Sequence, residues 1–236
     1  MSRVLLKAGG AVVEPAAARA LALHREGHQV CVVHGAGPQI SDEMARRGLE
    51  VTFVNGRRVT SAEALAVVRE SLARVNAALC AAIGPLAVGL SGDEIGLRAT
   101  RVPELGLVGD PLPSASPPVA AALAEGRIPV VAPLAEGPLN VNADEAAVAL
   151  AEGVGMERVL FETDVPGVLL GGATLTSIAA DDAERLLADG TFQGGIVPKL
   201  EAAVRAARFG LRVEIGQTAV VAEPERALAA KPEQGR

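Results

Sequence analysis

Short apolar segments without polar alternation recur along the chain, and longer segments of helical period separate them. A strand made only of apolar residues is buried on both faces, and helical connections between such strands favour parallel pairing. The sequence therefore predicts an α/β fold with a mainly parallel sheet covered by helices on both faces. The expected strands cover residues 4–6, 30–33, 87–90, 129–132, 158–161 and 213–215, and the expected helices cover 15–25, 38–47, 61–82, 119–125, 144–152, 181–187 and 198–209.

The composition excludes some classes of protein. The chain has 236 residues, 50% of them hydrophobic, with 22 Lys and Arg against 28 Asp and Glu, a net charge of −6. This length fits one large domain or two closely packed small ones. The acidic balance and the lack of Trp and Tyr argue against a nucleic-acid-binding protein, which presents basic surfaces and aromatic stacking platforms.

The cysteines and the apolar segments indicate in which cellular compartment the protein is expected. Cys31 and Cys80 lie far apart in apolar surroundings, which predicts reduced buried thiols rather than a disulfide framework or a zinc cluster. The first residues reach Gly9 before an apolar signal-peptide segment can form, and the uncharged stretch 77–91 is too short to span a membrane. We expect a cytoplasmic protein without a membrane partner.

Glycines directly follow the first two expected strands. Gly9 and Gly10 come after the first strand, and Gly35 and Gly37 come after the second. Ligands of an open parallel sheet lie at the carboxyl ends of its strands, where glycines let backbone N–H groups approach an anion. The two loops predict a phosphate site. Neither GxGxxG nor GxxxxGK[ST] is present, so neither a dinucleotide-binding sheet nor a P-loop is expected.

Three charged residues have ambiguous positions when each is taken alone. Lys7 ends the first strand, and Lys199 lies in the first turn of an expected helix, where a cation opposes the helix dipole. Such a placement indicates a lysine held for an anion, although a solvated lysine is the alternative reading. Asp144, like Asn142, could simply cap a helix.

Eight segments taken together resemble the acetylglutamate kinases of the amino acid kinase family. In the family's order, between about residues 3 and 215, they are KAGG (7–10), VHGAGPQI (33–40), NGRRVT (55–60), GLVGDP (106–111), IPVVAP (128–133), NVNADEAA (140–147), TDVPGVL (163–169) and GGIVPKLEAA (194–203). The resemblance implies one domain over 1–236 with an α/β/α sandwich fold. Its N-terminal lobe, about 1–145, would bind the acyl amino acid and dimerise, and its C-terminal lobe, about 146–225, would bind the nucleotide.

The implied activity is the ATP-dependent phosphorylation of the side-chain carboxylate of N-acetyl-L-glutamate in arginine biosynthesis, with ATP and Mg²⁺ bound. Lys7 and Lys199 resemble the lysines that neutralise the phosphates, and Asp144 resembles the carboxylate that orients both. Arg58 resembles the arginine that pairs with the substrate's α-carboxylate, and Asn140 the asparagine that contacts the acetylated amino acid. The resemblance also implies that the phosphoryl group is held by Gly9, Gly10, Gly35, Ala36 and Gly37. Of these residues, Gly35 and Ala36 would also contact the substrate. The nucleotide would be bound by Thr163, Asp164, Val165 and Gly167 together with Lys7 and Lys199. No side chain is expected to bind a metal.

The chain departs from the family's pattern at several points. Ala36 stands where three glycines in a row are usual, which would cost roughly 1 kcal/mol if the position needed a positive φ. Segment 89–97 is shorter than the usual hairpin, and 213–217 lacks an Asp-Gly-Arg-like turn. The chain also begins at its first strand, whereas arginine-inhibited hexameric relatives carry an additional N-terminal helix. We therefore expect an arginine-insensitive homodimer with helix 61–82 at its interface.

Two other functions compete with this one. A kinase of the same fold could act on aminoadipate or glutamate attached to a carrier protein, and it would need a basic surface to dock an acidic carrier. A non-catalytic metabolite sensor would be expected to lose one of Lys7, Asp144 or Lys199, and all three are present. The NGRRVT and NVNAD segments favour the free acetylated amino acid.

Overall fold

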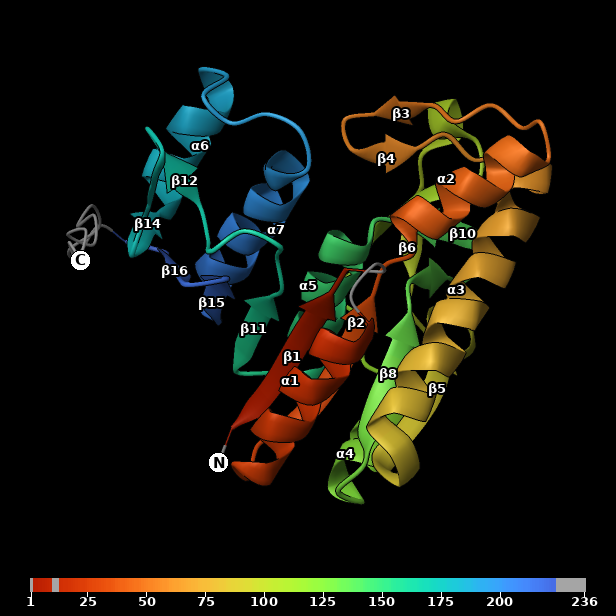
Figure 1. The fold of residues 1–236 in the computed structure, drawn as a ribbon, viewed down its shortest axis with the longest axis horizontal. Helices are drawn as coiled ribbons and strands as arrows, with labels where there is room; N and C mark the ends of the chain where they lie inside the picture. Colours follow the sequence, from red (N-terminus) through yellow and green to blue (C-terminus); the bar gives the residue numbers. More distant parts are fainter. Residues whose placement is uncertain (1, 10–12, 224–236) are drawn as a thin grey trace.

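One continuous sheet organises the molecule. A computed structural model describes residues 2–9 and 13–223 (Figure 1). In this part of the chain the main sheet has eight strands, and every neighbouring pair is parallel except β15 with β16. Their spatial order is β14 (Ser177–Ala179), β16 (Thr218–Val221), β15 (Arg212–Ile215), β11 (Arg158–Phe161), β1 (Arg3–Ala8), β2 (Gln29–His34), β8 (Ile128–Ala132) and β5 (Ala87–Ser91).

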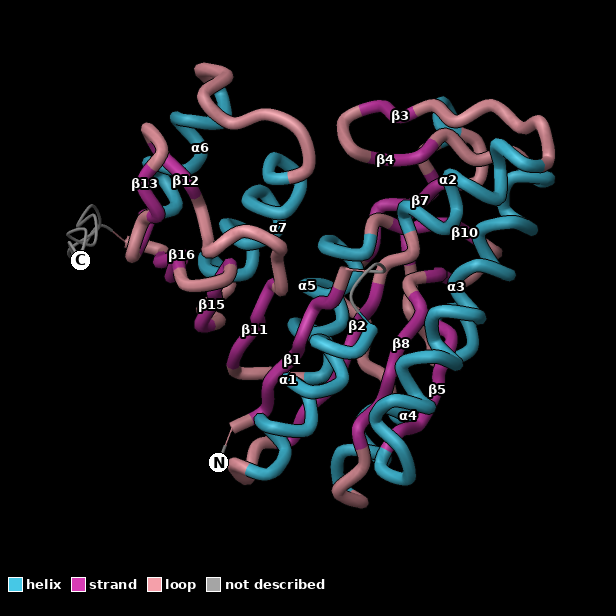
Figure 2. Tube along the Cα trace, viewed as in Figure 1, coloured by secondary structure: helices cyan, strands magenta, loops and turns pink. Residues whose placement is uncertain are grey.

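Helices cover both faces of this sheet, which confirms the predicted α/β/α sandwich (Figure 2). None of the described helices has the length and apolar character needed to cross a bilayer. One layer consists of α1 (Val13–Arg25), α2 (Gly37–Arg46) and α3 (Ala62–Ile83). The other consists of α4 (Pro117–Ala124), α5 (Ala143–Val154), α6 (Ala180–Ala188) and α7 (Ile196–Arg208).

The central strands contribute to two apolar cores. In β1, Leu5 belongs to the core under α4–α7, whereas Val4 and Leu6 belong to the core under α1–α3. Because both faces are buried, residues 4–6 of the strand are all apolar rather than alternating. Each core contains residues from both expected lobes, so the lobe boundary near residue 145 stays a prediction.

Both cysteines are free thiols, as predicted. Cys31 is fully buried in the core under α4–α7, and this burial raises the pKa of its thiol to about 12. Cys80 on α3 is partly buried.

Short strands and turns complete the fold. A four-stranded sheet contains β6 (Ala99–Arg101), β7 (Val108–Pro111), β10 (Leu139–Val141) and β9 (Leu134–Ala135). Two hairpins consist of β3 (Phe53–Val54) with β4 (Arg57–Arg58) and of β12 (Leu169–Leu170) with β13 (Ala173–Thr174). Single 3₁₀ turns cover Gly84–Leu86, Gly92–Glu94 and Pro103–Leu105.

The strand predicted at 213–215 is present as β15, but it is not the last strand of the chain. A turn at Gly216, where φ is +55°, sends the chain back as β16, and β14 then pairs with β16 at the edge. Segment 89–97 contains the end of β5 and a 3₁₀ turn rather than a hairpin.

Candidate active site

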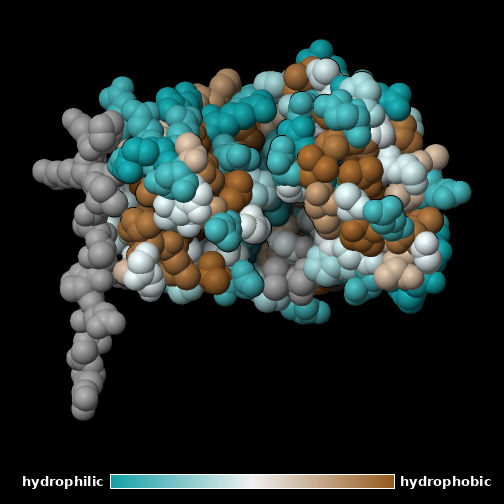
Figure 3. Space-filling view, turned by 90° about the horizontal axis from the view of Figure 1, so that it is seen from above, coloured by the Kyte–Doolittle hydropathy of each residue, from teal (hydrophilic) through white to brown (hydrophobic). Residues whose placement is uncertain are grey.

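Three charged side chains meet at the carboxyl edge of β1, where Figure 3 shows a hollow between the two halves of the molecule. Lys7 Nζ and Lys199 Nζ each lie 2.9 Å from Asp144 Oδ1. Lys7 belongs to β1, Asp144 to the first turn of α5, and Lys199 to the first turn of α7. Lys7 and Asp144 are only 7% and 8% exposed. Residues from distant parts of the sequence thus form one buried cluster of two cations and one anion.

The start of α5 explains why the Asp144 carboxylate is available to the lysines. Asn142 is the N-cap, and its Oδ1 accepts hydrogen bonds from the backbone N–H groups of Asp144 and Glu145 at 2.8 and 3.2 Å. Because Asn142 caps the helix, the Asp144 side chain has no capping role. The positive end of the helix dipole also favours a carboxylate in this turn.

The cluster shifts the pKa values of its members. Burial lowers the pKa of Lys7, repulsion from Lys199 lowers it further, and the attraction of Asp144 opposes both effects. Burial alone would raise the pKa of Asp144, but the two lysines outweigh it and hold that pKa below its ordinary value. Asp144 is therefore ionised at neutral pH.

A cavity of about 280 Å³ opens beside the cluster, and Lys7, Asp144 and Arg58 all line it. Arg58 is 6% exposed, and its Nη2 donates to Gly37 O at 3.1 Å and to Ser41 Oγ at 2.8 Å. Its guanidinium also lies 4.6 Å from the centre of the Phe53 ring. Burial lowers the pKa of Arg58, and no carboxylate of the described residues pairs with it. A buried cation without a carboxylate partner, facing a cavity, is a binding site for an anion.

The second glycine loop forms another wall of this cavity. Gly35, Ala36 and Gly37 line it, and α2 begins at Gly37 without a side-chain cap. An uncapped helix N-terminus presents backbone N–H groups and a positive dipole end, both of which favour an anion. Of the first loop, Gly9 lines the cavity, whereas Gly10 lies outside the described residues.

His34 supports this loop from inside the fold. Its ring is fully buried, with Nδ1 3.3 Å from Gly35 O and Nε2 3.1 Å from the amide nitrogen of Asn76. Burial lowers the pKa of His34 to about 4, so the imidazole is neutral. A neutral ring can donate through Nδ1 and accept at Nε2, which matches these two neighbours.

Ala36 causes no backbone strain. Its φ is −146°, outside the left-handed region, and its side chain is buried. We expect Ala36→Gly to lower the free energy of unfolding by about 0.5–1 kcal/mol, because glycine loses more conformational entropy on folding. Urea denaturation of the two proteins measures this difference. A more stable glycine variant would contradict it and would indicate that the alanine is strained.

Residues 2–217 match the model of the amino acid kinase family. The chain belongs to the amino acid kinase family. It is 42% identical over 202 residues to the acetylglutamate kinase of Jannaschia sp. (strain CCS1), covering 80% of this chain and 70% of that one. It is 37% identical over 218 residues to the acetylglutamate kinase of Geobacillus stearothermophilus, covering 86% and 84% of the two chains.

Solved structures show the same fold. The protein smu.665 from Streptococcus mutans UA159 superposes with a TM-score of 0.82 at 25% identity, covering 94% of this chain and 99% of that chain. The N-acetylglutamate synthase from Neisseria gonorrhoeae superposes with a TM-score of 0.79 at 21% identity, covering 94% and 60%. The second similarity concerns the fold alone.

The other predicted contacts of this amino acid kinase lie at the same edge of the sheet. Asn140 lines the 280 Å³ cavity, and its Nδ2 donates to Thr60 Oγ1 at 3.0 Å. Residues 163–167 follow β11, whose Phe161 pairs with Lys7 in the sheet register. A Cβ at Gly167 would lie 2.5 Å from Thr218 Oγ1, so a larger residue does not fit there. Thr163, Asp164, Val165 and Gly167 line neither the 280 Å³ cavity nor the larger one described below.

Side-chain ligands for a metal ion are lacking in the described part of the chain. No three His, Cys, Asp or Glu side chains of residues 2–9 and 13–223 come together as a metal-binding group. Asp144 is the one carboxylate among the described residues that line the 280 Å³ cavity, and two lysines already bind it. The described residues therefore do not form an all-protein Mg²⁺ site.

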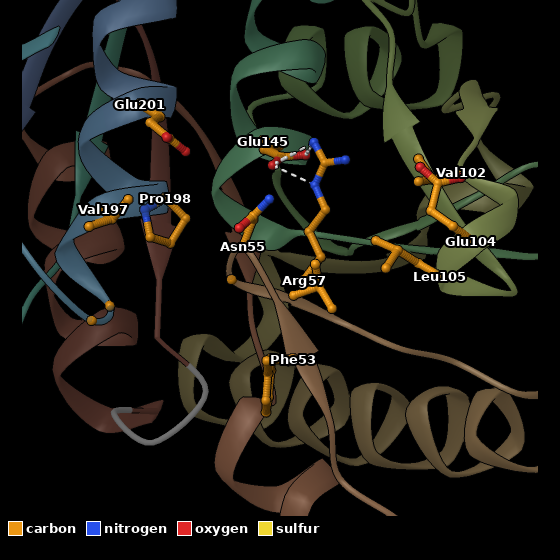
Figure 4. Close-up of a pocket in the computed structure, with 14 residues that line it drawn as sticks. Phe53, Asn55, Arg57, Val102, Glu104, Leu105, Glu145, Val197, Pro198 and Glu201 are labelled. Atoms are coloured by element: carbon orange, nitrogen blue, oxygen red, sulfur yellow. Dashed lines mark hydrogen bonds and ion pairs between the residues drawn. The ribbon is translucent and has the colours of Figure 1, made fainter. Parts of the chain in front are cut away.

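A second cavity of about 850 Å³ adjoins the first, and Phe53, Gly56 and Arg57 line both (Figure 4). Here Arg57 pairs with Glu145 and Asp110, two residues that the sequence analysis did not single out. The alternation of side chains along a strand was the available signal, because it directs the two adjacent arginines of NGRRVT to opposite faces.

Proposed function

We propose that the protein transfers the γ-phosphoryl group of ATP to the side-chain carboxylate of N-acetyl-L-glutamate, giving N-acetyl-L-glutamyl 5-phosphate in arginine biosynthesis. The observation that carries this function is the buried Lys7–Asp144–Lys199 cluster beside a cavity lined by Arg58, which pairs with no carboxylate of the described residues. Relatives named acetylglutamate kinase, at 42% and 37% identity over most of the chain, support the choice of substrate.

The reaction needs positioning and positive charge rather than a base. The acceptor carboxylate has an ordinary pKa of about 4.3, so it is already ionised at neutral pH. One of its oxygens attacks the γ-phosphorus, the bond to the bridging oxygen breaks, and ADP leaves with the electron pair. Charge spreads over the equatorial oxygens in the transition state, and Lys7 and Lys199 stabilise it. Two unit negative charges 4 Å apart repel by about 4 kcal/mol at an effective dielectric of 20, which these cations offset.

Arg58 gives the site its preference for a substrate with a second carboxylate. A planar guanidinium binds the α-carboxylate through two parallel hydrogen bonds. Asn140 contacts the acetylated amino group, and the apolar Ile40, Leu72 and Val108 of the same cavity accommodate the carbon chain and the acetyl methyl group. The backbone N–H groups of the two glycine loops hold the moving phosphoryl group.

The rest of the proposal concerns ligands and assembly. Mg²⁺ would arrive with the phosphates of ATP, whose charge it neutralises, since the described side chains offer it no ligand set. The nucleotide would contact Thr163, Asp164, Val165 and Gly167 in the C-terminal lobe as well as the two lysines. A homodimer formed through α3 and a cytoplasmic location complete the proposal.

The charge around the 850 Å³ cavity favours a free substrate over a carrier-linked one. Its charged lining consists of Glu104, Glu145 and Glu201 against Arg57. An acidic carrier protein that docked at this cavity would meet like charges, and like-charge contacts are unfavourable at an interface.

A hydroxamate-trapping assay tests the function directly, because hydroxylamine captures an acyl phosphate. The chain is incubated with ATP and Mg²⁺ and with N-acetyl-L-glutamate, N-acetyl-aminoadipate or a carrier-linked substrate. We expect the highest kcat/KM with N-acetyl-L-glutamate. Higher kcat/KM with the carrier-linked substrate would replace the proposal by the carrier alternative, and no product with any of them would indicate a sensor.

Because the pKa of Lys7 is lowered, we expect activity to fall with rising pH before the ordinary lysine pKa of 10.5 is reached. Lys7 must be protonated to shield the phosphoryl group, so kcat/KM for ATP falls as pH rises through a pKa below the ordinary 10.5. Stability changes in the opposite direction. Between the folded pKa of Lys7 and 10.5 the unfolded chain binds more protons, so this group makes the free energy of unfolding rise with pH.

The measurement is a pH profile of kcat/KM with urea denaturation at the same pH values, compared between the wild type and Lys7→Met. The wild type should gain stability relative to Lys7→Met across the window in which its own kcat/KM falls. A kcat/KM that stays constant up to the ordinary lysine pKa of 10.5 would contradict the prediction.

A further inference from the structure

The two adjacent arginines of β4 reach different parts of the molecule. Arg58 donates to Gly37 O and Ser41 Oγ of α2, beside the 280 Å³ cavity. Arg57 instead extends toward α5, as Figure 4 shows, and its guanidinium forms the dashed contacts to Glu145 drawn there. The proposed substrate contact of Arg58 leaves the role of Arg57 unexplained.

The guanidinium of Arg57 contacts both carboxylate oxygens of Glu145. Nε donates to Oε1 at 3.1 Å, and Nη2 lies 3.0 Å from Oε1 and 3.1 Å from Oε2. The side chains are 24% and 19% exposed, and Nη2 also forms an ion pair with Asp110. Charge-assisted contacts of this kind between a guanidinium and a carboxylate fix orientation as well as distance.

The β3–β4 hairpin depends on such side-chain contacts for its position. β3 and β4 form a two-stranded sheet of their own. A two-stranded hairpin alone is at best marginally stable in water, so its place on the molecule must be fixed by other contacts. At its turn, Asn55 and Gly56 have φ of +48° and +74°, and Asn142 Nδ2 lies 3.5 Å from Gly56 O.

The turn also lies against the helix that carries Lys199. A Cβ built at Gly56 would lie 3.0 Å from Cγ of Pro198, the residue directly before Lys199. On the other side, Glu145 directly follows Asp144 in the first turn of α5. The hairpin that carries Arg58 is therefore held against both helix starts that supply the catalytic cluster.

We propose that Arg57 is a positioning residue, which through Glu145 holds the β3–β4 hairpin in place and so sets where Arg58 meets the substrate's carboxylate. This inference rests on the proposed function, because it assigns to Arg58 the binding of N-acetyl-L-glutamate. The role is one of positioning, because the ion pairs of Arg57 among the described residues are with Glu145 and Asp110.

Steady-state kinetics of matched variants test the inference. For Arg57→Gln, which loses the pairs with Glu145 and Asp110, and for Glu145→Gln, which loses only the first, we expect KM for N-acetyl-L-glutamate to rise about tenfold, with KM for ATP and kcat within about threefold of wild type. The double variant should be no worse than Arg57→Gln. The exchange Arg57→Glu with Glu145→Arg should restore part of the affinity, because it rebuilds that pair but places a carboxylate near Asp110. Arg158→Gln is the control, because it breaks a 2.9 Å ion pair with Glu214 elsewhere in the fold.

Hydrogen–deuterium exchange separates the failure of this inference from the failure of the proposed function. Residues 53–58 should exchange faster in Arg57→Gln and in Glu145→Gln than in wild type or Arg158→Gln, whatever the substrate is. Unchanged KM and unchanged exchange in both variants would overturn the inference, and so would a fall in kcat with KM unchanged. A wild-type chain that does not phosphorylate N-acetyl-L-glutamate would instead overturn the proposed function, and unchanged exchange at 53–58 would then overturn the inference as well.

Discussion

We expect the replacement of Lys7 with Ala to lower kcat by about 10³-fold or more while the chain stays folded. The Lys7 ammonium group lies 2.9 Å from Asp144 Oδ1 and the residue is only 7% exposed, so water would not replace its fixed charge in the proposed reaction. The fold tolerates the loss because Asp144 keeps its 2.9 Å contact with Lys199. Single-turnover kinetics with saturating ATP, together with circular dichroism, measure both effects.

Two further variants test whether the loss of activity in Lys7→Ala is caused by the loss of its charge. Lys7→Met keeps most of the side-chain volume and should lose as much activity as Lys7→Ala, which separates charge from packing. Arg127→Ala is the control: it removes another cation, one that donates to Leu86 O and Ala87 O at the start of β5, and kcat should stay near wild type. A folded Lys7→Met variant with near-normal turnover would refute the proposed role of this lysine.

Replacing Asp144 with Asn affects both stability and activity. The change leaves two buried ammonium groups around a neutral amide, and removing one partner of a buried ion pair typically costs about 3 kcal/mol or more. The pKa of Lys7 should fall further, because burial and Lys199 already lower it and only Asp144 opposes them. We expect kcat to fall about 10²-fold or more, since both phosphate-shielding cations lose their orientation.

Urea denaturation as a function of pH checks the electrostatic part of this prediction. The folded-state pKa of Asp144 is lowered, so its contribution to stability is present above the unfolded pKa and disappears as pH falls through the folded value. In the Asp144→Asn variant, the free energy of unfolding should lack this pH-dependent contribution. Adding Lys7→Met to Asp144→Asn should recover part of the lost stability, and an Asn variant as stable as wild type at neutral pH would contradict the account.

Strands with a run of buried apolar residues could be predicted from sequence, and segments of mixed polarity could not. β11 was expected at 158–161 and lies at Arg158–Phe161, because Val159, Leu160 and Phe161 form such a run. β14 was not expected, because Ser177–Ala179 is a three-residue segment of mixed polarity. Its strand state comes from pairing with β16, a contact distant in sequence that no local periodicity reports.

The site was only partly predictable for a similar reason. The family's motifs indicated Lys7, Asp144 and Lys199, but nothing local to a lysine specifies a carboxylate 2.9 Å away from another part of the chain. One signal was available and unused: among 22 Lys and Arg residues the lysines are only Lys7, Lys199 and Lys231, so lysine is rare outside this site. The φ of Ala36 and the identity of the carboxylates that pair with Arg57 depend on packing, which no local sequence pattern reports.

The position of β1 in the sheet limits how the two halves can move. β1 pairs with β2 on one side and with β11 on the other, so the halves share a hydrogen-bonded seam. Separating them would break that ladder, whereas twisting the sheet would not. In such a rotation, displacement would grow with distance from the axis, so Lys7 at the end of β1 would move less than residues on the outer strands β14 and β5. The fold thus keeps this lysine near the axis, whereas a twist that displaced the β3–β4 hairpin would first have to break its contacts with α5 and α7.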